Sequence, residues 1–259
     1  GCTGLTFVEL PDTVETIQTN AFGDCENLTD INYPVSLRVA VSGYHSGPFT
    51  GCTNLTEIVV PEGVETLAAN VFSYAKSLQS VTLPSTLTVI GEEAFAGSGI
   101  TSLELPNGVT TIGDYAFYQC AALQSIRFGE NLTSIGYSTF TDCTGLTSIV
   151  LPSAVETIGS SAFSDCTALE SFVMGDKITV VPYGLFYGCT NLKNVHLSRN
   201  AKEIRNSCFT NCTSLSQIYI PSSVKYIYSN AFNGVSGITF LCALNSYAAE
   251  YALDRQIPI

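Results

Sequence analysis

Basic residues are scarce in this chain, and charged residues of either sign are few. The 259 residues contain 10 Lys and Arg against 22 Asp and Glu, which gives a formal net charge of −12. Because this excess of carboxylates repels phosphates, sequence-independent binding to nucleic acid or to an anionic membrane surface is disfavoured. Charged residues make up 12% and hydrophobic residues 46% of the chain, a balance typical of a folded protein with a continuous core.

Long apolar runs and short catalytic motifs are missing as well. No stretch of about 18 apolar residues is present, so we expect no direct insertion into a bilayer. None of the patterns GxSxG, HExxH, GxxxxGK[ST], GxGxxG and DxDxDG occurs, and the two histidines, His45 and His196, have no nucleophile or carboxylate at a telling spacing. The sequence therefore predicts no catalytic residues, no cofactor and no metal site, and hence no enzyme.

The chain has instead a repeat, marked by a recurring phenylalanine. Successive gaps of 27, 23, 23, 22, 23, 23, 23, 23 and 23 residues separate Phe22, Phe49, Phe72, Phe95, Phe117, Phe140, Phe163, Phe186, Phe209 and Phe232. Apolar residues recur six, nine and eleven positions after most of these phenylalanines. A fixed period of this length is the signature of a solenoid, in which each repeat forms one turn.

Each repeat contains one clear strand signal. Ile149 and Leu151, for example, are two apolar residues spaced by two and followed by Pro152, which cannot donate to a strand ladder. A second apolar pair, such as Val155 and Ile158, predicts an extended segment before the Ala-Phe turn. Because one unit cannot bury its own apolar side, we expect about ten units to stack as a β-rich α/β superhelix with one parallel sheet and short turns or helical corners.

The two ends and one insertion depart from the repeat. We predict a solenoid over residues 1–242, with an N-terminus truncated in mid-repeat because Cys2 belongs to a unit that lacks its phenylalanine, and a helical cap over residues 243–259. Asn245 or Ser246 can cap that helix. The gap of 27 places four extra residues within 38–48, which predicts a loop that offers Tyr44 and His45 as a contact site.

Eight of the ten cysteines occupy one position of the repeat, three residues after the phenylalanine. Ala75, Ser98 and Val235 stand there in other turns, which indicates a slot for a small, weakly polar side chain. Stacked turns are about 4.8 Å apart, wider than the Cβ separation of about 3.8 Å in a disulfide, so we expect buried reduced thiols. Cys208 and Cys242 lie outside this column and are the two candidates for a separate role.

Two columns of strand residues are expected to face outward. One is rich in serine, and the other includes the candidate ligand-binding residues Arg127, Val150, Val173, His196 and Tyr219. Tyrosine and arginine are favoured at protein interfaces. Ordinary β-forming residues on an exposed sheet are the alternative explanation for this column.

The unit LxxIxLPxxVxxIGxxAFxxC resembles the BspA-type (Treponema-type) leucine-rich repeat family of bacterial surface proteins, over almost the entire chain. It differs from the generic leucine-rich pattern because Cys precedes the strand leucine by three residues. The resemblance implies a leucine-rich repeat solenoid on the cell surface or secreted, which adheres without catalysis to host proteins, extracellular matrix or other bacteria. A structural spacer that carries another domain is an alternative. A carbohydrate-binding module, with glycans as partners, is another if exposed tyrosines line a groove.

Overall fold

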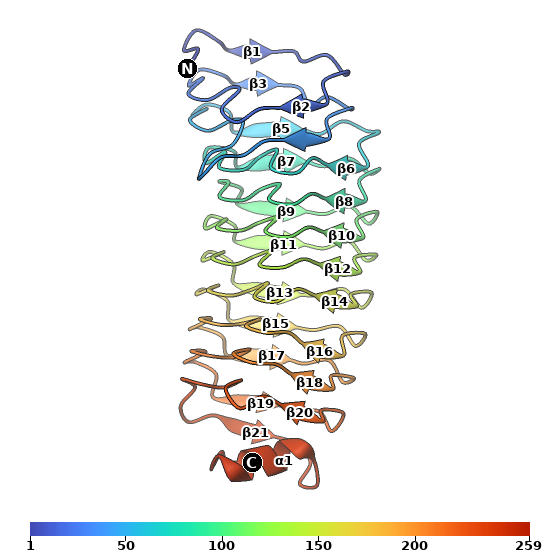
Figure 1. Ribbon diagram of the computed structural model, residues 1–259, viewed down its shortest axis with the longest axis vertical. Helices are drawn as coiled ribbons and strands as arrows, with labels where there is room; N and C mark the ends of the chain where they lie inside the picture. Colours follow the sequence, from blue (N-terminus) through green and yellow to red (C-terminus); the bar gives the residue numbers. More distant parts are fainter.

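The computed structural model describes residues 1–259 and stacks them as the turns of a rod, with the two termini at opposite ends (Figure 1). Every named strand pairs in parallel with the equivalent strand of a neighbouring turn. The register follows the repeat, since Ser148 pairs with Ser171 and Thr111 pairs with Ser134, each 23 residues further along. The predicted solenoid of about ten turns is confirmed.

One side of the rod is built from the odd-numbered strands and is called the odd row. In β13 the middle residue, Ile149, is buried, and its neighbours Ser148 and Val150 point outward. This alternation is the one predicted from the apolar spacing. The row comprises β1 (Phe7–Val8), β3 (Asp30–Ile31), β5 (Glu57–Val59), β7 (Ser80–Thr82), β9 (Ser102–Glu104), β11 (Ser125–Arg127), β13 (Ser148–Val150), β15 (Ser171–Val173), β17 (Asn194–His196), β19 (Gln217–Tyr219) and β21 (Thr239–Leu241).

The expectation of one parallel sheet is corrected by a second series of strands, the even row. The segment expected to be merely extended forms two-residue strands in each turn, such as Thr111 with buried Ile112. Two residues present only one inward side chain, which is too short an alternation to indicate a strand in sequence. The row comprises β2 (Thr16–Ile17), β4 (Val39–Ala40), β6 (Thr66–Leu67), β8 (Val89–Ile90), β10 (Thr111–Ile112), β12 (Ser134–Ile135), β14 (Thr157–Ile158), β16 (Val180–Val181), β18 (Glu203–Ile204) and β20 (Tyr226–Ile227).

The third side of the rod is a corner of tight bends around the recurring phenylalanine. The residues two before and two after Phe117, Tyr115 and Gln119, both have positive φ, at 56° and 57°. Phe117 N–H donates to the Thr139 carbonyl of the next turn at 2.8 Å, and Gln119 N–H donates to the Thr141 carbonyl at 2.8 Å. The corner therefore consists of turns rather than helices, and it links neighbouring turns by its own backbone hydrogen bonds.

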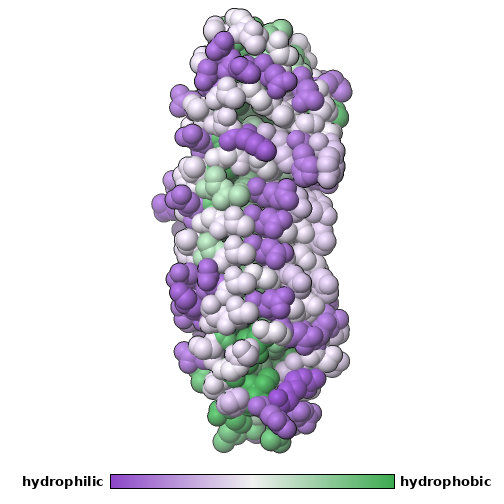
Figure 2. All heavy atoms as spheres, turned by 90° about the vertical axis from the view of Figure 1, so that its left-hand side faces the viewer, coloured by the Kyte–Doolittle hydropathy of each residue, from purple (hydrophilic) through white to green (hydrophobic).

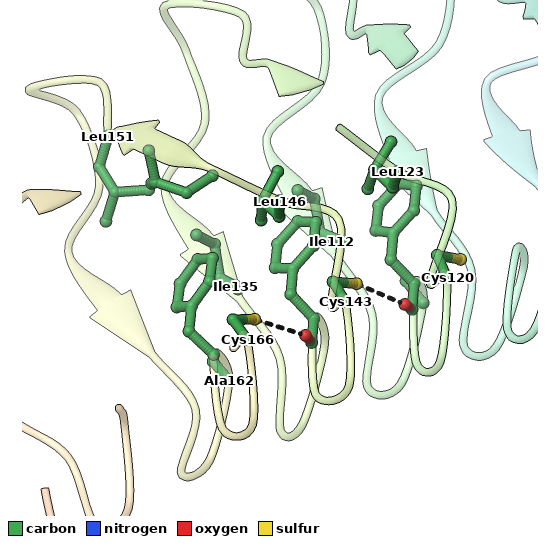
Figure 3. Packing of buried hydrophobic residues seen from close by; sticks show 14 of the residues in the cluster. Ile112, Cys120, Leu123, Ile135, Cys143, Leu146, Leu151, Ala162 and Cys166 are labelled. Carbon is green, nitrogen blue, oxygen red and sulfur yellow. Dashed lines mark hydrogen bonds between the residues drawn. The ribbon is translucent and has the colours of Figure 1, made fainter. Parts of the chain in front are cut away.

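The phenylalanine rings stack in a column inside the corner. Ring centroids lie 5.1 Å apart from Phe95 to Phe117, 5.0 Å from Phe117 to Phe140 and 5.0 Å from Phe140 to Phe163, with interplanar angles of 8° or less. Ile112 and Ile135 of the even row pack beside these rings, together with Leu123, Leu146 and Leu151, which flank strands of the odd row (Figure 3). The repeat thus produces one continuous core along the rod.

The cysteine column does more than fill space. Cys143 donates its thiol to the Phe117 carbonyl of the preceding turn at 3.1 Å, and Cys166 does the same to Phe140 at 3.1 Å (Figure 3). The expected slot for any small side chain is thus a hydrogen-bonding position. All ten cysteines are free thiols, and burial raises the pKa of Cys120 to about 12.

The single helix, α1 (Tyr247–Asp254), lies against the last turn (Figure 1). Ser246 is its N-cap and accepts a hydrogen bond from the Ala249 N–H at 3.3 Å. Tyr251 is buried, and its ring is parallel to that of Phe240 at 6.1 Å. The helix therefore covers the apolar end of the stack with its tyrosine and alanine face.

Candidate functional site

The five candidate strand residues lie at the same position of neighbouring turns and form what we call the strand strip. They are Arg127, Val150, Val173, His196 and Tyr219. Val150 pairs in register with Val173, which pairs with His196. Val150 is 68% exposed and Tyr219 57% exposed. Sequence reasoning missed a sixth member, Leu241, which pairs with Tyr219 and is 45% exposed, because β21 lies in the last, irregular turn.

Short polar side chains border the strand strip. Ser148, Ser171 and Asn194 occupy the outward position two residues earlier in the same strands and pair with one another in register. Because serine is small, the larger strip residues stand above this neighbouring column. In these turns the strip residues therefore project further from the odd row than the serines beside them.

Arg127 marks the N-terminal edge of the strip. Its guanidinium lies 3.5 Å from the Glu104 carboxylate on β9, and both side chains are largely exposed. An ion pair so open to water is worth little, so Arg127 remains free to contact a partner.

The same column is different in the N-terminal turns. The Asn32 amide is engaged by the Leu10 backbone, at 2.6 Å to its N–H and 2.9 Å to its carbonyl. Val59 is 64% exposed, but its neighbours in the column are Asn32 and Thr82. An apolar strip therefore exists only in the C-terminal half.

Tyr44 and His45 lie apart from the strand strip. They form the tip of a hairpin that joins β4 to the Phe49 corner. Figure 2 shows the side of the rod that lies on the left in Figure 1, where hydrophilic and neutral residues dominate and hydrophobic ones gather near the lower end. The His45 ring lies 4.2 Å from Tyr44 and 5.2 Å from Tyr74, edge-on in both cases. The structure thus divides the predicted binding residues between two sites.

A hollow of about 400 Å³ opens beside this hairpin, along the corner. It is lined by His45, Tyr74, Lys76, Gly97, Ser98, Gly99, Gln119, Ala121 and Ala122. Sequence reasoning did not select Tyr74, Lys76 or Gln119. The signal that could have found them is the gap of 22 after Phe95, which marks a turn one residue short.

The remaining predicted features lie elsewhere. Cys208 is fully buried, and burial raises its pKa well above the ordinary value, whereas Cys242 is partly exposed. No three His, Cys, Asp or Glu side chains are placed to hold a metal ion. The structure contains no helix with the length and apolar character needed to cross a membrane.

The sequence of this chain matches the model of the BspA type leucine rich repeat region. The match consists of six copies, which cover residues 1–120, 42–170 and 110–239. No curated protein matches the chain.

Several solved structures are similar to it. A leucine rich cell surface protein from Faecalibacterium prausnitzii is 28% identical, with a TM-score of 0.52, over 96% of this chain and 81% of that one. A leucine-rich repeat protein from Eubacterium ventriosum is 26% identical, with a TM-score of 0.65, over 92% and 78%. The T. pallidum leucine-rich repeat protein is 34% identical, with a TM-score of 0.58, over 61% and 77%.

Proposed function

This chain belongs to the BspA-type leucine-rich repeat family, and from that premise we propose that it is a non-catalytic binding protein, displayed on a bacterial surface or secreted. Its partner is a protein of a host or of another bacterial surface, and the strand strip is the face that holds it. The location outside the cell is supported by the Faecalibacterium relative, whose description is a leucine rich cell surface protein.

The observation that supports this role is the strand strip itself, in which Val150, Tyr219 and Leu241 are exposed and Val173 is half-buried. Six turns, separated by five intervals of about 4.8 Å, extend it over roughly 25 Å. That length is comparable to the side of a standard interface, which buries about 800 Å² on each partner. The strip also has the composition of an interface core, with two valines, a leucine and a tyrosine and no carboxylate.

Charge favours a particular kind of partner. The whole chain has a net charge of −12, while the strip itself contains Arg127 and His196. A partner with an apolar centre and a basic rim would match the strip and the net negative charge of the chain as a whole. Opposite charges at the rim raise the rate of association more than the final affinity.

The test is a binding screen of this protein against immobilised matrix proteins and bacterial surface proteins. The triple variant Val150→Glu, Val173→Glu, Tyr219→Ala replaces the strip. The matched control, Val59→Glu with Thr82→Glu, adds the same number of carboxylates to the same column in the N-terminal half. Circular dichroism checks that both variants are folded.

We expect the affinity of the triple variant for the partner to be more than about tenfold lower than that of the wild type, because residues at the centre of an interface contribute most of the binding energy. The control should bind as the wild type does. A partner that binds both variants equally would show that the strip is not the site. A wild type that binds no protein would favour the spacer role.

A further inference from the structure

The inserted hairpin is held firmly against the next turn. Gly43 N–H donates to the Ser46 carbonyl at 2.8 Å and Ser46 N–H donates to the Gly43 carbonyl at 3.2 Å, which closes the loop around its two tip residues. Gly47 approaches the following turn so closely that an added Cβ would collide with the Ser73 carbonyl. Backbone contacts, rather than the two aromatic side chains, therefore fix the position of the tip.

The tip supplies one wall of the hollow. The His45 ring stands between Tyr44 and Tyr74, with interplanar angles of 69° and 86°. Edge-to-face contacts of this kind are favourable for aromatic pairs and set the direction of each ring. Tyr44 is 93% exposed whereas Tyr74 is half-buried, so the aromatic wall rises from the corner into solvent.

The short turn supplies the floor. Gly97 and Gly99 stand on either side of buried Ser98, and Gly97 has a φ of +64°. A Cβ added at Gly97 would lie 2.5 Å from Cδ1 of Tyr74. The ring of Tyr74 can therefore lie over this turn only because the residue there has no side chain.

Polar groups surround the aromatic wall. Lys76 and Gln119 line the hollow, whereas the Ser98 hydroxyl lies 3.6 Å from the buried Cys120 thiol. No Asp or Glu lines the hollow, although the chain has 22 of them. Lys76 takes part in none of the five ion pairs of the protein. Burial, and after it the charge of Glu93, raises the pKa of Tyr74 above the ordinary phenol value, so the phenol is a hydrogen-bond donor at neutral pH.

We propose that this hollow binds a saccharide, and that it prefers a sugar that presents a carboxylate to Lys76. A pyranose ring has an apolar face of C–H groups that stacks on an aromatic ring, and hydroxyl groups at its edge that need donors and acceptors. The hollow combines these two features, and its volume lies in the range of about 300–1,000 Å³ typical of small-molecule sites. A cationic ligand is less favoured because Lys76 would repel it and no Asp or Glu lines the hollow, although the charge of Glu93 reaches Tyr74.

This site is independent of the protein-binding role proposed for the strand strip. No residue of the strip lines the hollow, and the hollow lies on the corner rather than on the odd row. Either proposal can therefore fail alone.

The experiment is calorimetric titration of the whole chain with two pairs of sugars. Sialyllactose is compared with lactose, and a hyaluronan tetrasaccharide with chitotetraose, so that each acidic probe has a neutral counterpart. The variants are Tyr74→Ala, which removes the wall, Lys76→Glu, which reverses the charge, and Ala122→Glu, which places a carboxylate at the exposed rim. Lys225→Glu makes the same charge change away from the hollow and is the control.

We expect an acidic sugar to bind the wild type and to lose about tenfold or more in affinity on Lys76→Glu, since a hydrogen bond between charged groups is lost and replaced by repulsion. Ala122→Glu should weaken the same sugar, Tyr74→Ala should weaken acidic and neutral sugars alike, and Lys225→Glu should change neither. Should no sugar bind at millimolar concentration, or should binding survive both Tyr74→Ala and Lys76→Glu, the saccharide site is wrong. Equal binding of acidic and neutral sugars would overturn the role of Lys76.

Discussion

The C-terminal and N-terminal halves of the rod are built from the same repeat but differ in regularity. From Phe117 onward every gap is 23 residues and the cysteine position is filled in five consecutive turns, whereas the gaps before it are 27, 23, 23 and 22, and Ala75 and Ser98 replace the cysteine. The regular half aligns its outward residues into the flat strand strip. In the irregular half, the insertion and the short turn interrupt the alignment of corner residues between turns, and a hollow lies there. A constant repeat length thus accompanies the extended strand strip, and changes in repeat length accompany the hollow.

The largest expected effect is the loss of stability at alkaline pH. Burial raises the pKa of the stacked thiols, to about 12 for Cys120 and Cys212, from an ordinary value of 9.0. A buried thiol stays neutral while the unfolded thiol ionises, so its contribution to stability is complete below pH 9.0 and is lost as the pH rises towards about 12. Denaturant unfolding followed by circular dichroism, at about pH 8 and at about pH 11, measures the loss.

The matched variant is Cys143→Ala with Cys189→Ala, which removes two ionisable groups from the regular half. Its stability should fall less between the two pH values than that of the wild type. Tyr33, in the irregular half, also has a pKa raised by burial, so the comparison with the variant is what isolates the thiols. An identical pH dependence in the two proteins would show that the thiol column does not control alkaline unfolding.

The next largest effect should come from the phenylalanine column. Phe140 stacks on Phe117 and Phe163 at 5.0 Å, so Phe140→Ala should destabilise the protein by about 3–5 kcal/mol through the cavity it leaves. Phe22 is only half-buried and stacks on Phe49 alone, at 5.6 Å, so Phe22→Ala should cost clearly less. Equal losses in thermal denaturation of the two variants would contradict a stability difference between the halves.

A smaller effect is expected from the thiol hydrogen bonds. Cys143→Ala removes a donor, but the Phe117 carbonyl keeps its bond from the Cys120 N–H, so the cost should be about 1 kcal/mol. The reverse change, Ala75→Cys, places a thiol where the irregular half lacks one and should stabilise it. Urea unfolding of both variants measures the two changes, and a destabilising Ala75→Cys would show that this turn does not accommodate the thiol.

The smallest effect should follow from Glu104→Gln, which breaks the exposed ion pair with Arg127 at the border between the halves. We expect a change of less than about 0.5 kcal/mol in unfolding free energy, because water already screens the pair. A larger change would mean that this border is a weak point of the stack.

Much of the fold could be predicted from the spacing of apolar residues and prolines, because every turn of a solenoid repeats the same pattern of buried and exposed positions. The inward positions of Ile149 and Leu151 and the outward position of Val150 follow from alternation around one proline. The tight bends of the corner were harder to predict from the sequence. Asp142, Asp165 and Gly188 nevertheless mark a repeat position rich in residues that tolerate positive φ. Reading that column for glycine, asparagine and aspartate would have indicated tight bends.

The two candidate sites differed in how visible they were. The strand strip lies within one column of the repeat, so its members could be selected by counting. The hollow joins His45 of the inserted hairpin to Tyr74, Gly97 and Gln119, which come from three successive turns and each stand two residues after the phenylalanine of their turn. The period connects these three corner residues but not His45, which lies in the insertion, and only the stacked structure shows that the hairpin tip stands beside them.

By itself, the sequence determined the turn length, the direction in which each strand residue points and the small side chain beside the phenylalanine, because burial acts on every repeat in the same way. The tertiary structure decided the features that depend on contacts between turns. These are the second strand row, the thiol bond from Cys143 to the carbonyl of Phe117 and the ring of Tyr74 lying over Gly97. Each of these features is a contact between atoms of neighbouring turns, and the distance between those atoms is fixed only when the turns stack.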